Sequence, residues 1–288
     1  MMLLAGLACW TTSTLTTRAQ ADPGLIAYEA FDYATGPLTG RNGGIGWSGS
    51  WSGASTNVVS SPGLAHAAWA DALDAAGNAF MLNRLESSAQ SFRSLSVPLG
   101  GTTGQVYVSF IAQVTNGTFA GVSCFSEATE RFFMGQPYLQ SQWGADLSPG
   151  SGPGIRTSGH SAALQSLLVY RLDFSMTDVR VRLYVNPPLG AEPPCPDLDA
   201  VRSGTFSFDR IRVAGGQSGG LMDELRIGRT YAAVVPHHPM HQAQPLFYQW
   251  WPKLSGTTTS LRGIAHSGSR YLAVGESHYA LSTDGHNW

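Results

Sequence analysis

Charged side chains are scarce in this sequence. Asp, Glu, Lys and Arg make up 12% of its 288 residues, about half the usual share, and the formal net charge is −2. There is no basic run and no acidic tail. Because nucleic-acid binding needs clustered Lys and Arg to neutralise phosphates, the composition argues against a nucleic-acid partner.

Cysteines are also few. Cys9, Cys124 and Cys195 are the three, and no two of them form a Cys-x-x-Cys pair. This spacing argues against a structural zinc site. Cys9 falls in the predicted leader described next, so Cys124 and Cys195 remain as one candidate disulfide, with two free thiols as the alternative.

Long apolar runs are missing as well. No segment reaches the roughly eighteen apolar residues that a transmembrane helix needs, so we predict no membrane span. The apolar run from Met1 to Trp10 is shorter, and Ala19-Gln20-Ala21 follows it as a small-x-small cleavage pattern. Residues 1–21 are therefore predicted to be a signal peptide, although no Lys or Arg precedes its apolar run. The protein is then expected outside the cell, on the cell surface or in the periplasm.

Catalytic motifs are absent from the sequence too. It contains no Gly-x-Ser-x-Gly, no His-Glu-x-x-His and no phosphate-binding loop. The only close glutamate pair between predicted strands, Glu127 and Glu130, is interpreted as a turn or solvated pair. The sequence therefore predicts no catalytic residue and no metal ligand.

Short alternating segments are abundant. Glycine occurs 34 times, apolar residues make up 43% of the chain, and turn-rich stretches separate strands predicted over residues 105–114, 167–185, 204–213 and 221–228. In the second of these, Val179, Val181 and Leu183 are expected to face a core, with Arg180 and Arg182 facing solvent. A break in alternation near residue 209 predicts a β-bulge. The pattern indicates an all-β, antiparallel sandwich.

Two features leave alternatives open. Residues 64–76 are rich in alanine, which favours a short helix, and the other interpretation is a loop over the sandwich. Trp47, Trp51 and Trp143 are candidate ligand-binding aromatics, with packing in the core as the alternative.

The strand of residues 221–228 contains a carboxylate that needs a partner. Its alternation places Leu225 and Ile227 inward, and Asp223 on the same side near a strand end. A carboxylate at such a position must be paired or hydrogen-bonded.

Several segments together carry a resemblance. In order along the chain they are IAYEAFDY (26–33), GWSGSW (46–51), FFMG (132–135), NPP (186–188), MDELRIG (222–228) and YAAV (231–234). This ordered set resembles the concanavalin A-like lectin/glucanase jelly rolls of bacterial exported proteins, the laminin G-like group. The resemblance implies a jelly-roll domain over residues 22–235. Some members bind calcium at one rim, but no residue here is assigned as a calcium ligand, and no other cofactor is expected.

The composition changes after residue 235. Residues 236–255 read as a Pro/His linker in which His237, His238 and His241 have no accompanying carboxylate or cysteine. Residues 256–288 read as three short strands. They end in STDGHNW, which resembles the Asp-box of sialidase-like and photosystem-assembly-factor-like β-propellers. The resemblance implies a partial blade with structural roles for Ser282, Asp284, Gly285 and Trp288. Because a propeller needs several blades, we expect the natural chain to continue beyond Trp288.

The sequence therefore supports an exported, non-catalytic binding or adhesion module for carbohydrate or extracellular matrix. Its expected partner is a polysaccharide or a cell-surface glycan. A glycoside hydrolase or lyase on the same fold is one alternative, because the fold does not settle the function. A structural spacer for a downstream β-propeller is the other.

Overall fold

The computed structural model describes residues 24–68, 71–82, 89–150, 153–217, 219–239, 261–266, 270–275 and 279–282. The predicted signal peptide and Cys9 lie outside these ranges. The chain divides into two compact units, residues 1–240 and 241–288. Across the described ranges the only helix is α1 (Tyr231–Val234), which is too short to cross a membrane. The all-β prediction is confirmed.

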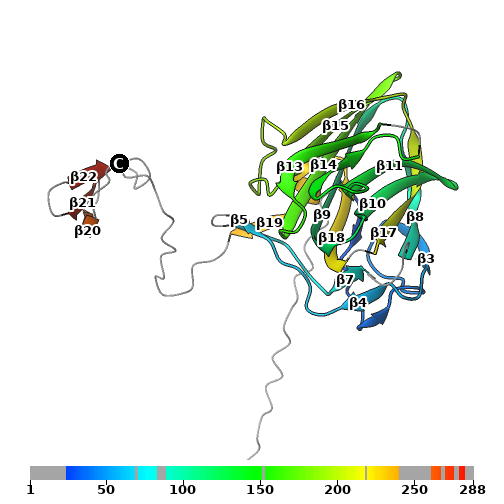
Figure 1. Cartoon of the computed structure of the whole chain (residues 1–288), viewed down its shortest axis with the longest axis horizontal. Coiled ribbons are helices and arrows are strands. Elements are labelled where there is room, and N and C mark those ends of the chain that lie inside the picture. Colours follow the sequence, from blue (N-terminus) through cyan, green and yellow to red (C-terminus); the bar gives the residue numbers. More distant parts are fainter. Residues whose placement is uncertain are drawn as a thin grey trace, which may run out of the picture. The chain divides into compact units, whose positions relative to one another are not determined.

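Two antiparallel sheets form a β-sandwich in the larger unit (Figure 1). The nine-stranded sheet has the order β16-β15-β14-β9-β18-β7-β4-β2, with β1 also paired to β18. Its strands are β1 (Leu25–Glu29), β2 (Gly36–Pro37), β4 (Val58–Ser60), β7 (Ala79–Leu82), β9 (Gly104–Asn116), β14 (Ser166–Phe174), β15 (Asp178–Val185), β16 (Leu198–Ser203) and β18 (Gly219–Gly228).

The seven-stranded sheet has the order β13-β12-β11-β10-β17-β8-β3. Its strands are β3 (Trp47–Gly53), β8 (Ala89–Gly100), β10 (Phe119–Ser126), β11 (Thr129–Gln136), β12 (Gln142–Asp146), β13 (Ile155–Ser161) and β17 (Ser207–Gly216). Strands far apart in sequence are neighbours, as β17 lies between β8 and β10. This is the two-sheet arrangement of a jelly roll.

The main core lies between the two sheets and follows the alternation seen in the sequence. Val179, Val181 and Leu183 are fully buried in it. Arg180 and Arg182 point to the opposite face, where they pair with Asp199 and Asp173. The predicted facing of this strand is confirmed, because a period of two places alternate side chains on opposite faces of a strand.

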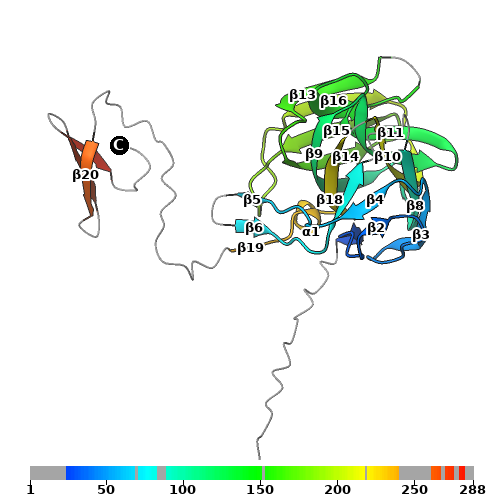
Figure 2. The same ribbon diagram turned by 60° about the horizontal axis from the view of Figure 1, so that its bottom comes forward.

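The outer face of the nine-stranded sheet carries a second apolar cluster. Ile111 and Leu167 of the sheet pack there against Val234 of α1 and Leu73. Leu73 belongs to a small sheet formed by β5 (Ala67–Ala68), β6 (Asp71–Leu73) and β19 (His237–Pro239), near α1 (Figure 2). The middle of the nine-stranded sheet is therefore covered on both faces.

The alanine-rich segment forms strands where it is described, so the expectation of a helix is wrong. Its ends are fixed by tertiary contacts, since Leu64 N donates to Asp223 Oδ2 and Ala76 N donates to Glu224 Oε1. These bonds override a weak local preference for helix. His237 and His238, placed by the sequence in a linker, instead pair with this segment in β19.

The two cysteines of the larger unit do not pair, so the candidate disulfide is wrong. Cys124 points into the core from β10, and Cys195 is an exposed free thiol. Burial raises the pKa of the Cys124 thiol. Cys124 therefore acts as a small apolar core side chain.

The smaller unit contains three antiparallel strands, β20 (Leu261–His266), β21 (Tyr271–Gly275) and β22 (Tyr279–Ser282). Ser282 is buried at the end of β22, opposite Tyr271. Asp284, Gly285 and Trp288 lie outside the described residues. The Asp-box and the propeller blade stay predictions.

One buried hydroxyl joins the two sheets. Tyr170 of β14 accepts a hydrogen bond from Gly135 N (2.9 Å) and donates to Gly144 O (2.6 Å), both on the seven-stranded sheet. Replacing Tyr170 by phenylalanine leaves both backbone groups without this partner. We expect the free energy of unfolding to fall by about 1–3 kcal/mol in chemical denaturation. An unchanged denaturation midpoint would show that the hydroxyl contributes nothing.

Candidate functional site

A row of arginine and phenylalanine side chains lies on the outer face of the seven-stranded sheet. The strand register places Arg210 beside Ser94 and Phe125, and Arg212 beside Phe92 and Ser123. Alternate residues of the same strands point into the core. We call this set the arginine–aromatic face; its members are Gln90, Phe92, Ser94, Ser123, Phe125, Glu130, Arg210 and Arg212.

The rings and guanidinium groups of this face stack on one another. Phe92 and Phe125 meet edge to face, with 5.3 Å between ring centroids. Arg210 Cζ lies 4.8 Å from the Phe92 centroid and 5.5 Å from that of Phe125. Arg212 Cζ lies 5.1 Å from the Phe125 centroid. Each close cation–π contact contributes about 0.5–2 kcal/mol, so the two arginines are held against the rings.

Polar neighbours fix Arg212 further. Its Nη2 donates to Glu130 Oε1 (2.7 Å) and Ser123 Oγ (2.9 Å), and its Nη1 donates to Gln90 Oε1 (3.1 Å). Burial lowers the pKa of Arg212, and the charge of Glu130 opposes that change. The Arg212 guanidinium is thus held in one geometry by three polar partners and one ring.

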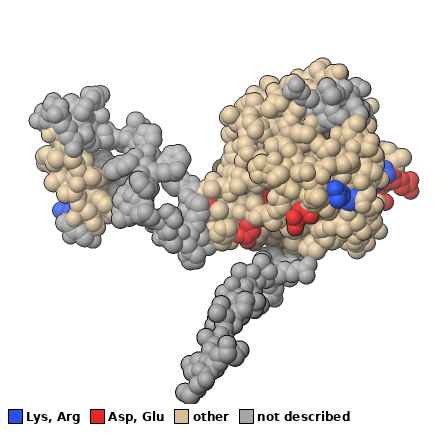
Figure 3. Space-filling view, turned by 90° about the horizontal axis from the view of Figure 1, so that it is seen from below, with Lys and Arg blue, Asp and Glu red and all other residues tan. Residues whose placement is uncertain are grey.

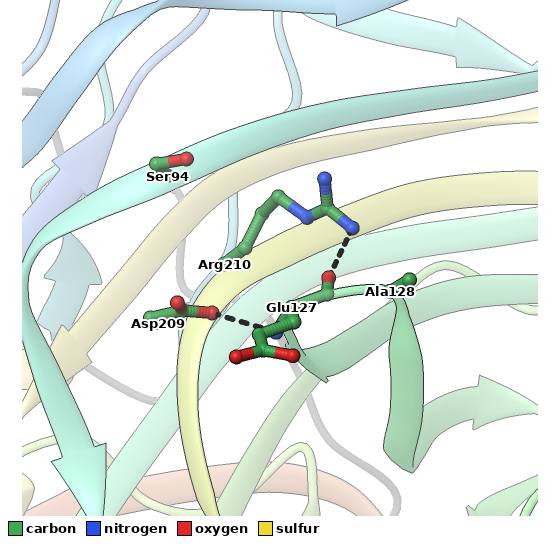
Figure 4. A pocket seen from close by; sticks show the side chains of 5 residues that line it. All are labelled: Ser94, Glu127, Ala128, Asp209 and Arg210. Carbon is green, nitrogen blue, oxygen red and sulfur yellow. Dashed lines mark hydrogen bonds between the residues drawn. The ribbon is translucent and has the colours of Figure 1, made fainter.

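A polar hollow of about 210 Å³ adjoins the face (Figure 4). Ser94, Glu127, Ala128, Asp209 and Arg210 line it. Glu127 N donates to Asp209 Oδ1 (3.4 Å), and Arg210 Nη2 donates to the carbonyl oxygen of Glu127. The hollow therefore carries two carboxylates, one hydroxyl and one guanidinium.

The backbone around the hollow explains these side-chain directions. The register between β17 and β8 shifts between Phe208 and Arg210, which confirms the predicted bulge near residue 209. A bulge turns a side chain away from the regular alternation, here Asp209 toward the β10–β11 turn. Glu127 in that turn has a φ of 53°. This left-handed conformation is uncommon for a residue with a side chain.

The predicted tryptophans lie elsewhere. Trp51 is 1% exposed and Trp143 is fully buried, so the structure gives both a packing role in the core. Trp47 is half-buried, and its Nε1 donates to Tyr28 O (3.0 Å). The sequence analysis did not identify Phe92, Phe125, Arg210 or Arg212 as site residues. The alternation of the two arginines with Ile211 and Val213 was the available signal.

Trp51 belongs to a buried polar cluster around Glu29 and Arg93. Glu29 pairs there with Arg93, and both side chains are about 1% exposed. Glu29 Oε2 also accepts hydrogen bonds from Tyr33 Oη (2.8 Å) and Trp51 Nε1 (2.9 Å). Arg93 Cζ lies 5.3 Å from the Trp47 ring centroid and 5.7 Å from that of Trp51. The cluster is internally satisfied and structural.

A second buried cluster, formed by Asp223, Glu224 and Arg226, fixes the alanine-rich segment (residues 64–76) over the nine-stranded sheet. A register shift in β18 between Asp223 and Arg226 places Glu224 in the left-handed region at φ 57°. Asp223 then pairs with Ile111, whose side chain belongs to the outer apolar cluster. The prediction that Asp223 faces the main core with Leu225 is therefore wrong, because the bulge reverses the alternation between them.

The carboxylates of this second cluster are strongly perturbed. Burial raises the pKa of Asp223 to about 8, although hydrogen bonds from Leu64 N and Glu224 N lower it. Burial also raises the pKa of Glu224, while Arg226, with Nη2 2.5 Å from Glu224 Oε2, lowers it. Asp223 Oδ2 accepts from Leu64 N at 2.7 Å, as a buried carboxylate needs.

Arg171 on the outer face of the nine-stranded sheet pairs with Asp173 and with Glu192 from the connection between β15 and β16. Glu192 accepts from Tyr107 Oη and Tyr184 Oη (each 2.7 Å) and from Arg171 Nη1 (3.0 Å). Burial raises the pKa of Glu192, but these hydrogen bonds and Arg171 outweigh it and hold that pKa low. Charges are also sparse on the side of the larger unit seen in Figure 3.

No metal centre emerges from the part of the chain that the structure describes, where no three His, Cys, Asp or Glu side chains are grouped to hold an ion. His237 and His238 lie in β19, and His241 lies outside the described residues.

Comparisons with known proteins give similarity only at the level of structure. No protein-family model matches the chain, and no curated protein sequence matches it. Domain 4 of the extracellular arabinanase AbnA from Geobacillus stearothermophilus, in complex with arabinotriose, is 14% identical. It matches over 73% of this chain and 96% of its own, with a TM-score of 0.38.

Two further solved structures are similar to the same extent. A beta-1,3-glucanase from Mycobacterium marinum is 12% identical over 72% of this chain and all of its own, with a TM-score of 0.37. The Emp47p carbohydrate recognition domain is 9% identical over 73% of this chain and 99% of its own, with a TM-score of 0.33. At these TM-scores the similarities carry no information on ligand or activity.

Proposed function

We propose that this chain is an exported, non-catalytic binding domain whose arginine–aromatic face holds a polysaccharide or a cell-surface glycan. One observation carries the proposal. Arg210 and Arg212 are stacked on Phe92 and Phe125 on the outer face of a sheet, beside a hollow lined by two carboxylates, a hydroxyl and the Arg210 guanidinium. Export rests on the pattern of residues 1–21 and on the low charge of the sequence.

The chemistry of the face suits a sugar chain. A sugar ring has apolar C–H faces and a rim of hydroxyl groups, so its site needs apolar surface together with a few fixed polar groups. Phe92, Arg210 and Arg212 are half-buried and offer the accessible surface. Phe125 is buried and packs against them. Ser94, Glu127 and Asp209 place hydrogen-bonding groups at one side. Arginine and aromatic residues also dominate binding hot spots in proteins.

One observation favours a second function. Glu127 and Asp209 line the same hollow, and a glycoside hydrolase uses two carboxyl groups flanking the scissile bond. Against this, Glu127 is exposed, and its backbone N–H already donates to Asp209. A reducing-sugar assay on each retained polysaccharide separates the two functions. Release that disappears in Glu127→Gln and in Asp209→Asn would establish hydrolysis.

We expect the full chain to be retained on at least one polysaccharide, and Arg210→Gln to weaken that binding about 30-fold. The change removes the cation over Phe92, and loss of a hot-spot side chain costs about 2 kcal/mol, which corresponds to this factor. The measurement is affinity electrophoresis across a panel of neutral and acidic polysaccharides, with and without calcium.

Arg180→Gln is the matched control. Arg180 is an exposed arginine on the nine-stranded sheet, paired with Asp199 rather than stacked on a ring. We expect it to bind as the unchanged protein does. Retention on no polysaccharide, or equal losses in the two variants, would contradict the proposed site.

A further inference from the structure

The two Asn-Gly pairs of this sequence are Asn42-Gly43 and Asn116-Gly117. Both asparagines are exposed, so exposure does not distinguish them. An Asn-Gly pair can deamidate because the glycine nitrogen, unhindered by a side chain, can reach the asparagine Cγ. The reaction needs the glycine peptide to turn toward that carbon, so the local hydrogen bonds decide which pair reacts.

Gly43 is held in place. Its N–H donates to Tyr33 Oη (2.9 Å), and that hydroxyl donates to the buried carboxylate of Glu29. The side chain of Asn42 is held as well, because its Oδ1 accepts from Arg93 Nη2 (3.0 Å). The attacking nitrogen and the amide are thus both tied to the buried Glu29–Arg93 cluster.

Gly117 is held less tightly. It lies between β9 and β10 with a φ of 115°, and its N–H has no hydrogen-bond partner among the residues that the structure describes. Asn116 Oδ1 accepts from Gly219 N (2.8 Å). The Oδ1 of each asparagine thus accepts one hydrogen bond, so the two sites differ in the N–H of the following glycine, which is bonded at Gly43 and, within the described part of the chain, not at Gly117.

We propose that Asn116 is a site of spontaneous deamidation in the folded protein and that Asn42 is protected. Gly117 N loses its proton to solvent and attacks Asn116 Cγ. A C–N bond forms, the Cγ–Nδ2 bond breaks, and ammonia leaves. Water then opens the succinimide at either carbonyl, giving aspartate or isoaspartate without any oxidation or reduction.

The products differ in their effect on the sheet. Aspartate keeps an oxygen that can accept from Gly219 N and adds a negative charge at the connection between β9 and β10. Isoaspartate inserts one backbone carbon at the end of β9, where Asn116 pairs with Gly219 of β18. The isoaspartate form is therefore expected to loosen this end of the nine-stranded sheet.

The test is peptide mapping by mass spectrometry of the folded full chain during incubation in mildly alkaline buffer. We expect deamidation at Asn116 to be at least about tenfold faster than at Asn42, because the reaction at Asn42 must first break the hydrogen bond from Gly43 N to Tyr33 Oη. In denaturant the two rates should converge. Equal rates in the folded protein, or a faster reaction at Asn42, would overturn the proposal.

Tyr33→Phe provides a gain-of-rate test. It removes the acceptor of the Gly43 N–H and keeps the ring, so deamidation at Asn42 should accelerate while that at Asn116 stays unchanged. No acceleration at Asn42 in a folded Tyr33→Phe variant would show that this hydrogen bond does not protect the site. Neither outcome depends on glycan binding.

Discussion

Arg93→Met is expected to lower the free energy of unfolding by about 3–5 kcal/mol, because it leaves the buried carboxylate of Glu29 without its cation. The cost is large since neither side chain reaches solvent. The change also removes hydrogen bonds from Arg93 to Gly43 O (2.8 Å) and Gly49 O (3.2 Å), and the stacking of Arg93 on two tryptophans. Chemical denaturation followed by tryptophan fluorescence measures the loss.

Glu29→Gln tests the same pair from the other side. It leaves Arg93 buried and charged, so a loss of similar size is expected. The double variant should lose less than the sum of the single changes, because it contains no uncompensated charge. Arg180→Met removes an exposed arginine and should change stability little. Losses that simply add would contradict a direct interaction between Glu29 and Arg93.

The free energy of unfolding is expected to fall as the pH rises from about 6.5 to 8, because Asp223 is protonated in the folded chain and ionised in the unfolded one. The pKa of this carboxyl is raised to about 8 on folding, so the folded state holds the extra proton over this range. The sign follows from linkage: stability decreases with pH wherever the folded state binds more protons, by at most about 1.4 kcal/mol per pH unit. The raised pKa of Glu224 acts in the same direction.

Other titratable groups limit the pH range over which the Asp223 effect can be measured alone. Burial lowers the pKa of His66. The contribution of His66 to the free energy of unfolding therefore increases with pH up to about 6.5, and below that pH it opposes the Asp223 effect. The pKa values of Asp199 and Glu192 are lowered, so their stabilisation is lost only under acid conditions. Asp223→Asn should flatten the dependence between pH 6.5 and 8. A slope that survives this change would assign the effect to another group.

The alternation of apolar and polar residues predicted much of the fold. It failed where the backbone departs from regular strand geometry. The inward facing of Val179 follows from the two-residue period of its strand. The bulge near Asp209 follows from an interruption of that period in another strand. Asp223 was placed on the wrong side because nothing in the MDELRI segment shows that Glu224 adopts a left-handed conformation. The alanine-rich segment was ambiguous for a different reason, since its path depends on bonds to β18, far away in the sequence.

The site was harder to predict than the fold. Arg210 and Arg212 could be identified as two arginines on one strand face, but the rings beneath them come from β8 and β10. These strands meet β17 only through a jelly-roll register that the sequence does not state. Tryptophans are the residues that a sequence suggests first as surfaces for stacking sugar rings. Trp51 and Trp143 are instead buried in the core.

The central claim is that the arginine–aromatic face holds a glycan, and hydrogen exchange with and without bound polysaccharide tests it most directly. We expect the amides of the turn at Glu127 and of β17 around Arg210 to exchange more slowly in the bound protein. Those of β15 and β16 on the other sheet should not change. Protection confined to the nine-stranded sheet, or a bound protein with no change at Glu127 and Arg210, would contradict the account.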